Sequence, residues 1–102
     1  MKTSHDTDLD TAARRFSALG HRRRLEILIH LSASGGCSCG DVVAEVDLAQ
    51  STISQHLKQL VEAGLVRHSA CGQRSLYAVD REALGDLLLD LTSLSACCRK
   101  EG

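Results

Sequence analysis

The sequence contains no proline and almost no aromatic residues. Only Phe16 and Tyr77 are aromatic among the 102 residues, and tryptophan is absent. Because proline disrupts helix interiors, its absence suits a mainly helical chain. The scarcity of aromatic side chains means that leucine, isoleucine, valine and alanine must build the hydrophobic core. A chain of this length predicts one small domain.

Long apolar stretches are also missing. None approaches the roughly 18 residues that would cross a bilayer, and the first residues, MKTSHDTDLD, are polar and unlike a signal peptide. We therefore expect no membrane partner and a cytoplasmic protein with reduced thiols. We expect a disordered tail over residues 1–7 and one folded domain over residues 8–98, because no linker or internal repeat divides the chain.

Motifs of common enzyme classes are absent as well. No CxxC pair lies beside a βαβ pattern, which a thioredoxin-like oxidoreductase would need. Neither a phosphate-binding glycine loop nor the histidine and glutamate spacing of metalloproteases is present. We therefore expect a protein that is not an enzyme and that uses no organic cofactor.

The most informative segment is Gln50–Val66, which reads QSTISQHLKQLVEAGLV. Asp47–Gln50 fits a turn that enters a helix here, with Gln50 or Ser51 near its N-cap. Gly64 stands where a helix C-terminus favours a residue that tolerates positive φ. The apolar side chains recur at the i, i+4, i+7 and i+8 spacing of one helix face. They are Ile53, Leu57, Leu60 and Val61.

The opposite face of this predicted helix is polar. Its side chains are hydrogen-bonding groups that can reach phosphates or base edges. They are Ser51, Thr52, Ser54, Gln55, His56 and Lys58. A helix with a buried stripe and an outward polar row is typical of the recognition helix of a helix-turn-helix.

Helical spacing also marks three earlier segments and one near the C-terminus. The earlier helices are expected at Leu9–Leu19, His21–Ser32 and Asp41–Val46. Asp80 can cap the last helix, Arg81–Ala96. Its apolar stripe is too continuous to face water, so we expect a second subunit to cover it. The stripe contains Leu84, Leu87, Leu88, Leu91 and Leu94.

The period changes to two within Val66–Val79. Alternation of this kind predicts a β-hairpin, and Cys71-Gly72-Gln73 is expected at its tip. Taken together, these elements predict a mainly α fold with a small β-hairpin, which is a winged helix-turn-helix.

The charge of the chain is close to balanced, with a formal net charge of −1 at pH 7. Nucleic-acid-binding domains are usually basic, so DNA binding would depend on local patches and on dimerisation. Basic residues do cluster at Arg14–Arg15 and Arg22–Arg24, and they recur at Lys58, Arg67 and Arg74.

The order of these elements resembles the ArsR/SmtB family of winged-helix repressors. The resemblance extends from about residue 12 to residue 98. It is strongest in ALGHRRRLEILIHL (Ala18–Leu31), CSCGDV (Cys37–Val42) and QSTISQHLKQLVEAGLV (Gln50–Val66). It implies a homodimeric repressor of double-stranded operator DNA that leaves the operator when an inducer binds, often a metal or metalloid ion. It also implies that the first and last helices build the dimer interface.

The same resemblance assigns the DNA contacts. Arg67 and Arg74 of the wing should meet phosphates or the minor groove. For His56, helix packing or capping is the alternative role. The residues expected in the major groove are Gln50, Ser51, Thr52, Ser54, Gln55, His56 and Lys58.

Five cysteines are a high count for a chain of this size. Adjacent or CxC cysteines form strained disulfides, so metal or redox chemistry is favoured. Cys37-x-Cys39 resembles the arsenic-sensing CxCxxC pattern of the family, except that Val42 occupies the third position. Thiolates select soft ions, and trivalent arsenic or antimony takes three thiolates in the related sensors. A third ligand must therefore come from elsewhere.

Cys97 and Cys98 could supply that ligand. Adjacent cysteines on an intact helix point about 100° apart, so both could bind one ion only where the helix has frayed. Some family members with terminal vicinal cysteines sense arsenite there. We predict thiol ligands at Cys37, Cys39, Cys97 and Cys98, with arsenite or antimonite as the inducer. For Cys71 we expect the role of a small apolar residue.

The cysteines also fit other functions. The zinc site of other family members uses histidine on the last helix, and Arg81–Ala96 contains none. The same repressor could sense oxidants or reactive sulfur through its cysteines. A thiol metal buffer or metallochaperone would bind the ion but not DNA, and the polar face of the recognition helix argues against it.

Overall fold

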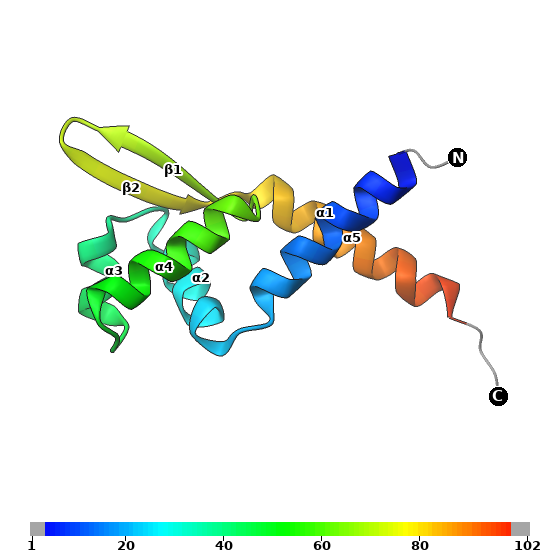
Figure 1. The fold of residues 1–102 in the computed structure, drawn as a ribbon, viewed down its shortest axis with the longest axis horizontal. Helices are drawn as coiled ribbons and strands as arrows, with labels where there is room; N and C mark the ends of the chain where they lie inside the picture. The colour runs from blue at the N-terminus through cyan, green and yellow to red at the C-terminus, as the bar shows by residue number, and fades with distance from the viewer. Residues whose placement is uncertain (1–3, 99–102) are drawn as a thin grey trace.

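The computed structural model describes residues 4–98. Within them, five helices and one hairpin follow in the predicted order (Figure 1), so the mainly α winged fold is confirmed. The elements are α1 (Ser4–Leu19), α2 (Arg22–Ser34), α3 (Cys39–Glu45), α4 (Gln50–Glu62), β1 (Val66–Cys71), β2 (Arg74–Val79) and α5 (Arg81–Cys97). Helices α1 and α5 cross at one end of the molecule, and α2, α3, α4 and the hairpin form the other end.

The core is aliphatic, as the composition predicts. Its largest fully buried side chains come from α2, α3, α4 and the start of the hairpin, and they are Ile27, Leu31, Val42, Ile53, Leu57, Leu60 and Leu65. The apolar stripe predicted for α4 therefore faces inward, with Val61 half-buried at its edge. This burial fixes the rotation of α4 and turns its polar row outward.

Local signals set the ends of α4. The helix begins at Gln50, directly after the predicted turn, and its N-cap residue, Ala49, makes no side-chain hydrogen bond to the helix. Gly64 follows the helix with a φ of 82°, as expected for a residue that ends a helix. The short loop between α3 and α4 and the sharp end of α4 complete the helix-turn-helix.

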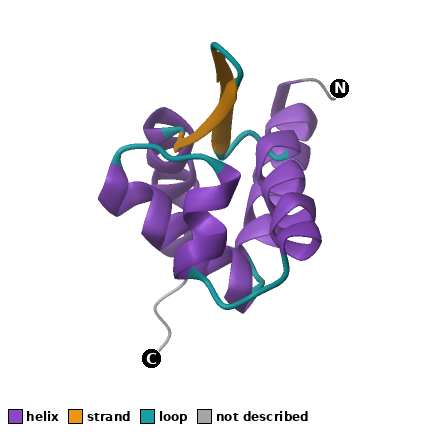
Figure 2. Cartoon of the chain, turned by 90° about the vertical axis from the view of Figure 1, so that its left-hand side faces the viewer, coloured by secondary structure: helices purple, strands orange, loops and turns teal. Residues whose placement is uncertain are grey.

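The hairpin forms with the expected tip. Strands β1 and β2 pair antiparallel from Val66 opposite Val79 to Cys71 opposite Arg74, which leaves Gly72 and Gln73 in the turn. Figure 2 shows the hairpin projecting from the helical body. A third segment joins this sheet: Cys37 N–H donates to Tyr77 O at 2.9 Å, and Tyr77 N–H donates to Cys37 O at 2.8 Å. The residues before α3 are thereby fixed to β2.

The first helix is longer than predicted. It begins at Ser4, so residues 4–7 are helical where a disordered tail was expected, and residues 1–3 lie outside the described part of the chain. The single domain over residues 8–98 stays a prediction.

The apolar stripe of α5 divides between the core and the surface. Leu87 is buried and Leu84 is half-buried, whereas Leu88, Leu91 and Leu94 are 64%, 52% and 63% exposed. On the crossing helix α1, Leu9 and Phe16 are also exposed. The exposed leucines of α5 and the exposed apolar residues of α1 are called the α1/α5 apolar face below.

No helix in residues 4–98 combines the length and the apolar character needed to cross a membrane.

Candidate DNA-binding surface and thiol site

The polar row of α4 is exposed, as the sequence predicts. All but one of the predicted helix contacts are open to solvent, and they are Gln50, Ser51, Thr52, Ser54, Gln55 and Lys58. The helix is held against the core by Ile53, Leu57 and Leu60, which are fully buried. A rigidly seated helix with exposed amide, hydroxyl and ammonium groups has the chemistry needed to read a major groove. Contact of each of these residues with DNA stays a prediction.

His56 differs from its neighbours because it is half-buried between α4 and α2. Arg24 Nε donates a hydrogen bond to His56 Nδ1 at 3.3 Å, and Arg24 Nη2 donates to Gln59 Oε1 at 2.5 Å. The His21 and His56 rings lie 4.6 Å apart between centroids. These contacts fit the alternative role of His56, which is packing between two helices. Its contact with DNA stays a prediction.

Acidification is expected to lower the free energy of unfolding through His56. Burial, then the charges of His21 and Arg24, hold the pKa of His56 below its ordinary value of 6.5 in the folded chain. Between the folded and unfolded pKa values, the unfolded state binds more protons, so stability falls as the pH drops below 6.5. Urea unfolding at pH about 7.5 and about 5.5 measures the fall. His56→Gln should reduce it, and an unchanged fall would contradict this assignment.

The two predicted wing arginines lie at opposite ends of the hairpin. Arg67 pairs with Ala78 near the base, and its Nε donates to Asp80 Oδ2 at 3.3 Å. Asp80 is also the N-cap of α5 and accepts the Ala83 N–H at 3.1 Å. The Ala83 amide is the main cause that lowers the pKa of Asp80, and Arg67 adds to it. Arg67 therefore ties the hairpin to α5.

Arg74 lies beside the turn at the tip of the wing. Its Nη2 is 3.7 Å from Asp41 Oδ2 of α3, and 65% of its side chain is exposed. An arginine at this place can reach a phosphate or the minor groove if the wing lies along DNA.

A groove between α4 and the hairpin adds residues that the sequence analysis did not select. It has a volume of about 300 Å³ and includes Ser54 and Lys58 from α4 and His68 and Tyr77 from the hairpin. The His68 and Tyr77 rings stack with centroids 4.6 Å apart and planes 9° apart. The alternation of side chains along the two strands is compatible with His68 and Tyr77 on one face of the hairpin. Only the strand register places them opposite each other.

The predicted CxC thiols lie where the wing, α3 and α4 meet. Cys37 is 6% exposed, and its backbone is paired with Tyr77 of β2. Cys39 is the first residue of α3 and is half-buried, with Sγ 3.5 Å from Ser54 Oγ. One thiol is thus fixed to the wing, and the other contacts the recognition helix.

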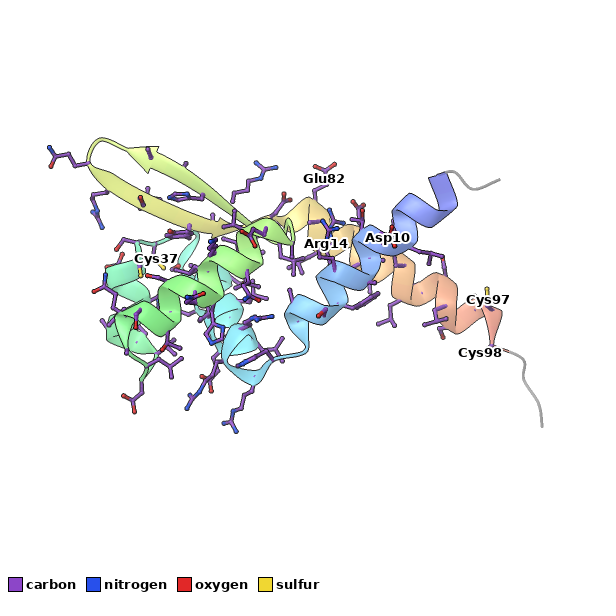
Figure 3. All side chains as sticks on the ribbon, in the orientation of Figure 1. Asp10, Arg14, Cys37, Glu82, Cys97 and Cys98 are labelled. Atoms are coloured by element: carbon purple, nitrogen blue, oxygen red, sulfur yellow. The ribbon has the colours of Figure 1, made fainter. Side chains whose placement is uncertain are left out.

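The terminal thiols lie at the far end of the molecule. Figure 3 shows Cys97 and Cys98 at the end of α5, opposite the end that holds Cys37. Both are exposed, and the helix stops at Cys97. Cys98 is extended, and its Sγ donates to Leu94 O at 3.5 Å. The helix therefore does not fix the two thiols 100° apart.

One chain does not bring the two cysteine pairs together. Among the residues that the structure describes, no three histidine, cysteine or acidic side chains are grouped to hold a metal ion. The CxC pair supplies two thiols, and no third cysteine whose side chain the structure describes is grouped with them. The side chain of Cys71 lies outside the described part of the chain.

A seated helix with an exposed polar row, preceded by a short helix and followed by a β-hairpin, defines a winged helix-turn-helix DNA-binding protein. Comparison with known proteins agrees. A family profile described as "Helix-turn-helix domain" matches residues 19–69. The HTH-type transcriptional regulator YgaV of Escherichia coli (strain K12) is 34% identical over 85 residues, which are 83% of this chain and 86% of that protein.

Two further comparisons define the family more narrowly. An arsenical resistance operon repressor of Bacillus subtilis (strain 168) is 34% identical over 90 residues, covering 86% of this chain and 82% of the repressor. The structure of an ArsR-like transcriptional regulator from Rhodococcus sp. RHA1 matches with a TM-score of 0.80 and 25% identity, over 86% of this chain and 82% of that one. The chain belongs to the ArsR/SmtB family of transcriptional regulators, and its relatives are regulators rather than enzymes.

Proposed function

We propose that this chain is a cytoplasmic, homodimeric repressor that leaves its operator when a thiophilic ion binds its cysteines, with arsenite or antimonite as the inducer. One observation carries the proposal. The Cys39 thiol lies 3.5 Å from Ser54, which belongs to the exposed polar row of α4. A thiol ligand and a DNA-reading surface therefore share one contact. The name of the Bacillus subtilis relative, an arsenical resistance operon repressor, supports the choice of inducer.

The α1/α5 apolar face supports a homodimer. The exposed leucines of α5, which are Leu88, Leu89, Leu91 and Leu94, leave a large apolar surface open to water in a single chain, together with Leu9 and Phe16 on the crossing helix. Such a surface marks an interface, and a twofold axis would let the same face cover itself. The dimer would present two α4 helices to two half-sites of the operator.

Release would begin at the CxC segment. Drawing Cys37 and Cys39 toward one soft ion would pull on the β2 backbone through Tyr77 and on α4 through Ser54. A packed unit responds to such a pull by moving as a body. Tilting α4 would take the polar row out of register with both half-sites of a dimer at once. The third thiolate would come from outside the CxC pair, either Cys97 or Cys98 of a partner or an external thiol.

Oxidant or reactive-sulfur sensing is the second candidate. The observation that favours it is the exposure of Cys97 and Cys98, because accessible neighbouring thiols can be oxidised and linked. A metallochaperone is a weaker candidate, since it would have no use for the exposed polar row of α4.

Loss of a basic side chain near DNA is expected to weaken binding to every duplex. Lys58→Ala and Arg74→Ala should each lower the slope of log affinity against log salt by roughly one, because each phosphate contact releases counterions. Gln55→Ala should instead change which operator is preferred. Anisotropy titrations at several salt concentrations measure both effects, with Arg81→Ala on α5 as the control that leaves the slope unchanged. Unaltered sequence preference in Gln55→Ala would show that the register of α4 on DNA is wrong.

A further inference from the structure

We propose that Asp41 is a positioning residue that competes with DNA phosphate for the wing arginine Arg74. The proposal rests on the proposed DNA-binding function, and it adds a residue from outside the predicted contact set. Asp41 Oδ2 lies 3.7 Å from Arg74 Nη2, and 53% and 65% of the two side chains are exposed. In the chain without DNA, a carboxylate of α3 therefore lies within ion-pair distance of the guanidinium that the wing offers to DNA.

A capping box fixes the carboxylate of Asp41 at the start of α3. Ser38 N–H donates to Asp41 Oδ2 at 3.1 Å, and Asp41 N–H donates to Ser38 Oγ at 3.2 Å. The oxygen that accepts the Ser38 amide is the same one that faces Arg74. An aspartate side chain is ionised at neutral pH. Arg74 therefore meets a negative charge whose position is already set.

The backbone brings this box to the wing. Cys37 precedes Ser38 and forms both of its backbone hydrogen bonds with Tyr77, three residues beyond Arg74 on β2. The start of α3 therefore lies beside β2, and Asp41 reaches the tip of the hairpin. Ser38 also separates the two predicted sensor thiols, so a displacement of Cys37 or Cys39 would also displace the carboxylate that faces Arg74.

Phosphate and carboxylate accept hydrogen bonds from the same face of a guanidinium. Arg74 must exchange Asp41 for phosphate when the wing meets DNA, and the exposed pair is weak enough for the exchange to occur. Asp41 should consequently lower DNA affinity by a small factor, and only while Arg74 is present.

A double-mutant cycle tests this dependence. Asp41→Asn removes the charge but keeps an amide oxygen that can accept the Ser38 N–H, so the cap is retained. We expect Asp41→Asn to tighten binding to a labelled duplex by about threefold in the parent chain. In the Arg74→Ala background, the gain should disappear apart from a general charge effect.

Asp47→Asn measures that general charge effect. Asp47 is an exposed carboxylate in the loop before α4, outside the capping box, so its removal should act equally in both backgrounds. The proposal would be overturned if Asp41→Asn raised DNA affinity equally in the parent and in Arg74→Ala. It would also be overturned if Asp41→Asn weakened DNA binding by the parent. If Arg74→Ala binds DNA as tightly as the parent, Arg74 does not contact DNA and the proposed role of Asp41 is wrong, whereas DNA binding through α4 is unaffected by that result. If the parent binds no duplex, the DNA-binding function itself fails.

Discussion

Cys39→Ser is expected to bind operator like the parent chain and to remain bound when arsenite is added. In the parent, saturating arsenite should weaken operator binding by about 5- to 150-fold, which is the usual range of coupling between two sites. The variant should lose nearly all of that change, because serine is a poor ligand for a soft ion. Anisotropy titrations of labelled operator at increasing arsenite measure the difference.

Cys37 requires a different substitution from Cys39. Its side chain is almost fully buried in the hydrophobic core, so a serine hydroxyl there would be buried among apolar groups at a cost of about 1–3 kcal/mol. Cys37→Ala removes the thiol without burying a hydroxyl, and it should abolish release while the chain stays folded. A Cys37→Ala chain that responds fully to arsenite would restrict the site to other cysteines.

The terminal pair provides the decisive comparison. If only Cys97→Ser/Cys98→Ser loses the response, the sensor lies on α5 and the CxC pair is structural. If both the CxC variants and the terminal double variant lose it, ligands from the two ends meet across a dimer, since one chain holds them at opposite ends. A normal response from every variant would eliminate thiol sensing.

Leu91→Glu is expected to convert a dimer into a monomer and to reduce operator affinity by about 100-fold or more. Leu91 is at the middle of the exposed leucines of α5, so a buried carboxylate there would face its own copy across a twofold axis. Loss of the dimer removes the gain from binding two linked half-sites, which reaches 10²–10⁴. Sedimentation at micromolar concentration and operator titration measure the two effects.

Ser93→Glu is the matched control for the dimer. It adds the same charge to the same helix, two residues and about 200° around from Leu91, at a position that is already exposed and polar. Dimerisation and operator binding should persist in this variant. If the parent chain sediments as a stable monomer, the proposed homodimer is wrong, and so is the proposal that two α4 helices bind two half-sites.

Features with local causes could be predicted from the sequence. The inward face of α4 follows from the spacing of Ile53, Leu57 and Leu60, all fully buried. The positive φ of Gly64 and the N-cap of Asp80 follow from residue type and position. These predictions succeed because a helix face or a cap depends on neighbours within one or two turns.

Features that depend on distant partners could not be predicted. Nothing in the CxC motif indicates that Cys37 pairs with Tyr77, since the bridge joins residues 40 positions apart. The packing of His56 depends on Arg24 from another helix, and the pairing of Arg67 depends on Asp80 from across the hairpin. In each case a residue selected for its chemistry has a structural partner that only the fold supplies.

The division of the α5 stripe shows the same limit at one helix. Periodicity identifies Leu84, Leu87, Leu88, Leu91 and Leu94 as one apolar face but does not say what covers each residue. The fold buries Leu87 against the core and leaves Leu88 exposed one residue later. When the core of one chain covers only part of an apolar helix face, the uncovered part indicates an interface with a second subunit.

The most direct test of the account is an anisotropy titration of the parent chain against a labelled duplex from upstream of its own gene, without and with arsenite. The account predicts salt-dependent binding that arsenite reverses, with recovery when excess dithiol removes the arsenite. Binding that arsenite leaves unchanged would contradict thiophilic induction and favour another inducer. Absence of binding to this duplex and to a pool of random duplexes at low salt would contradict the DNA-binding function itself.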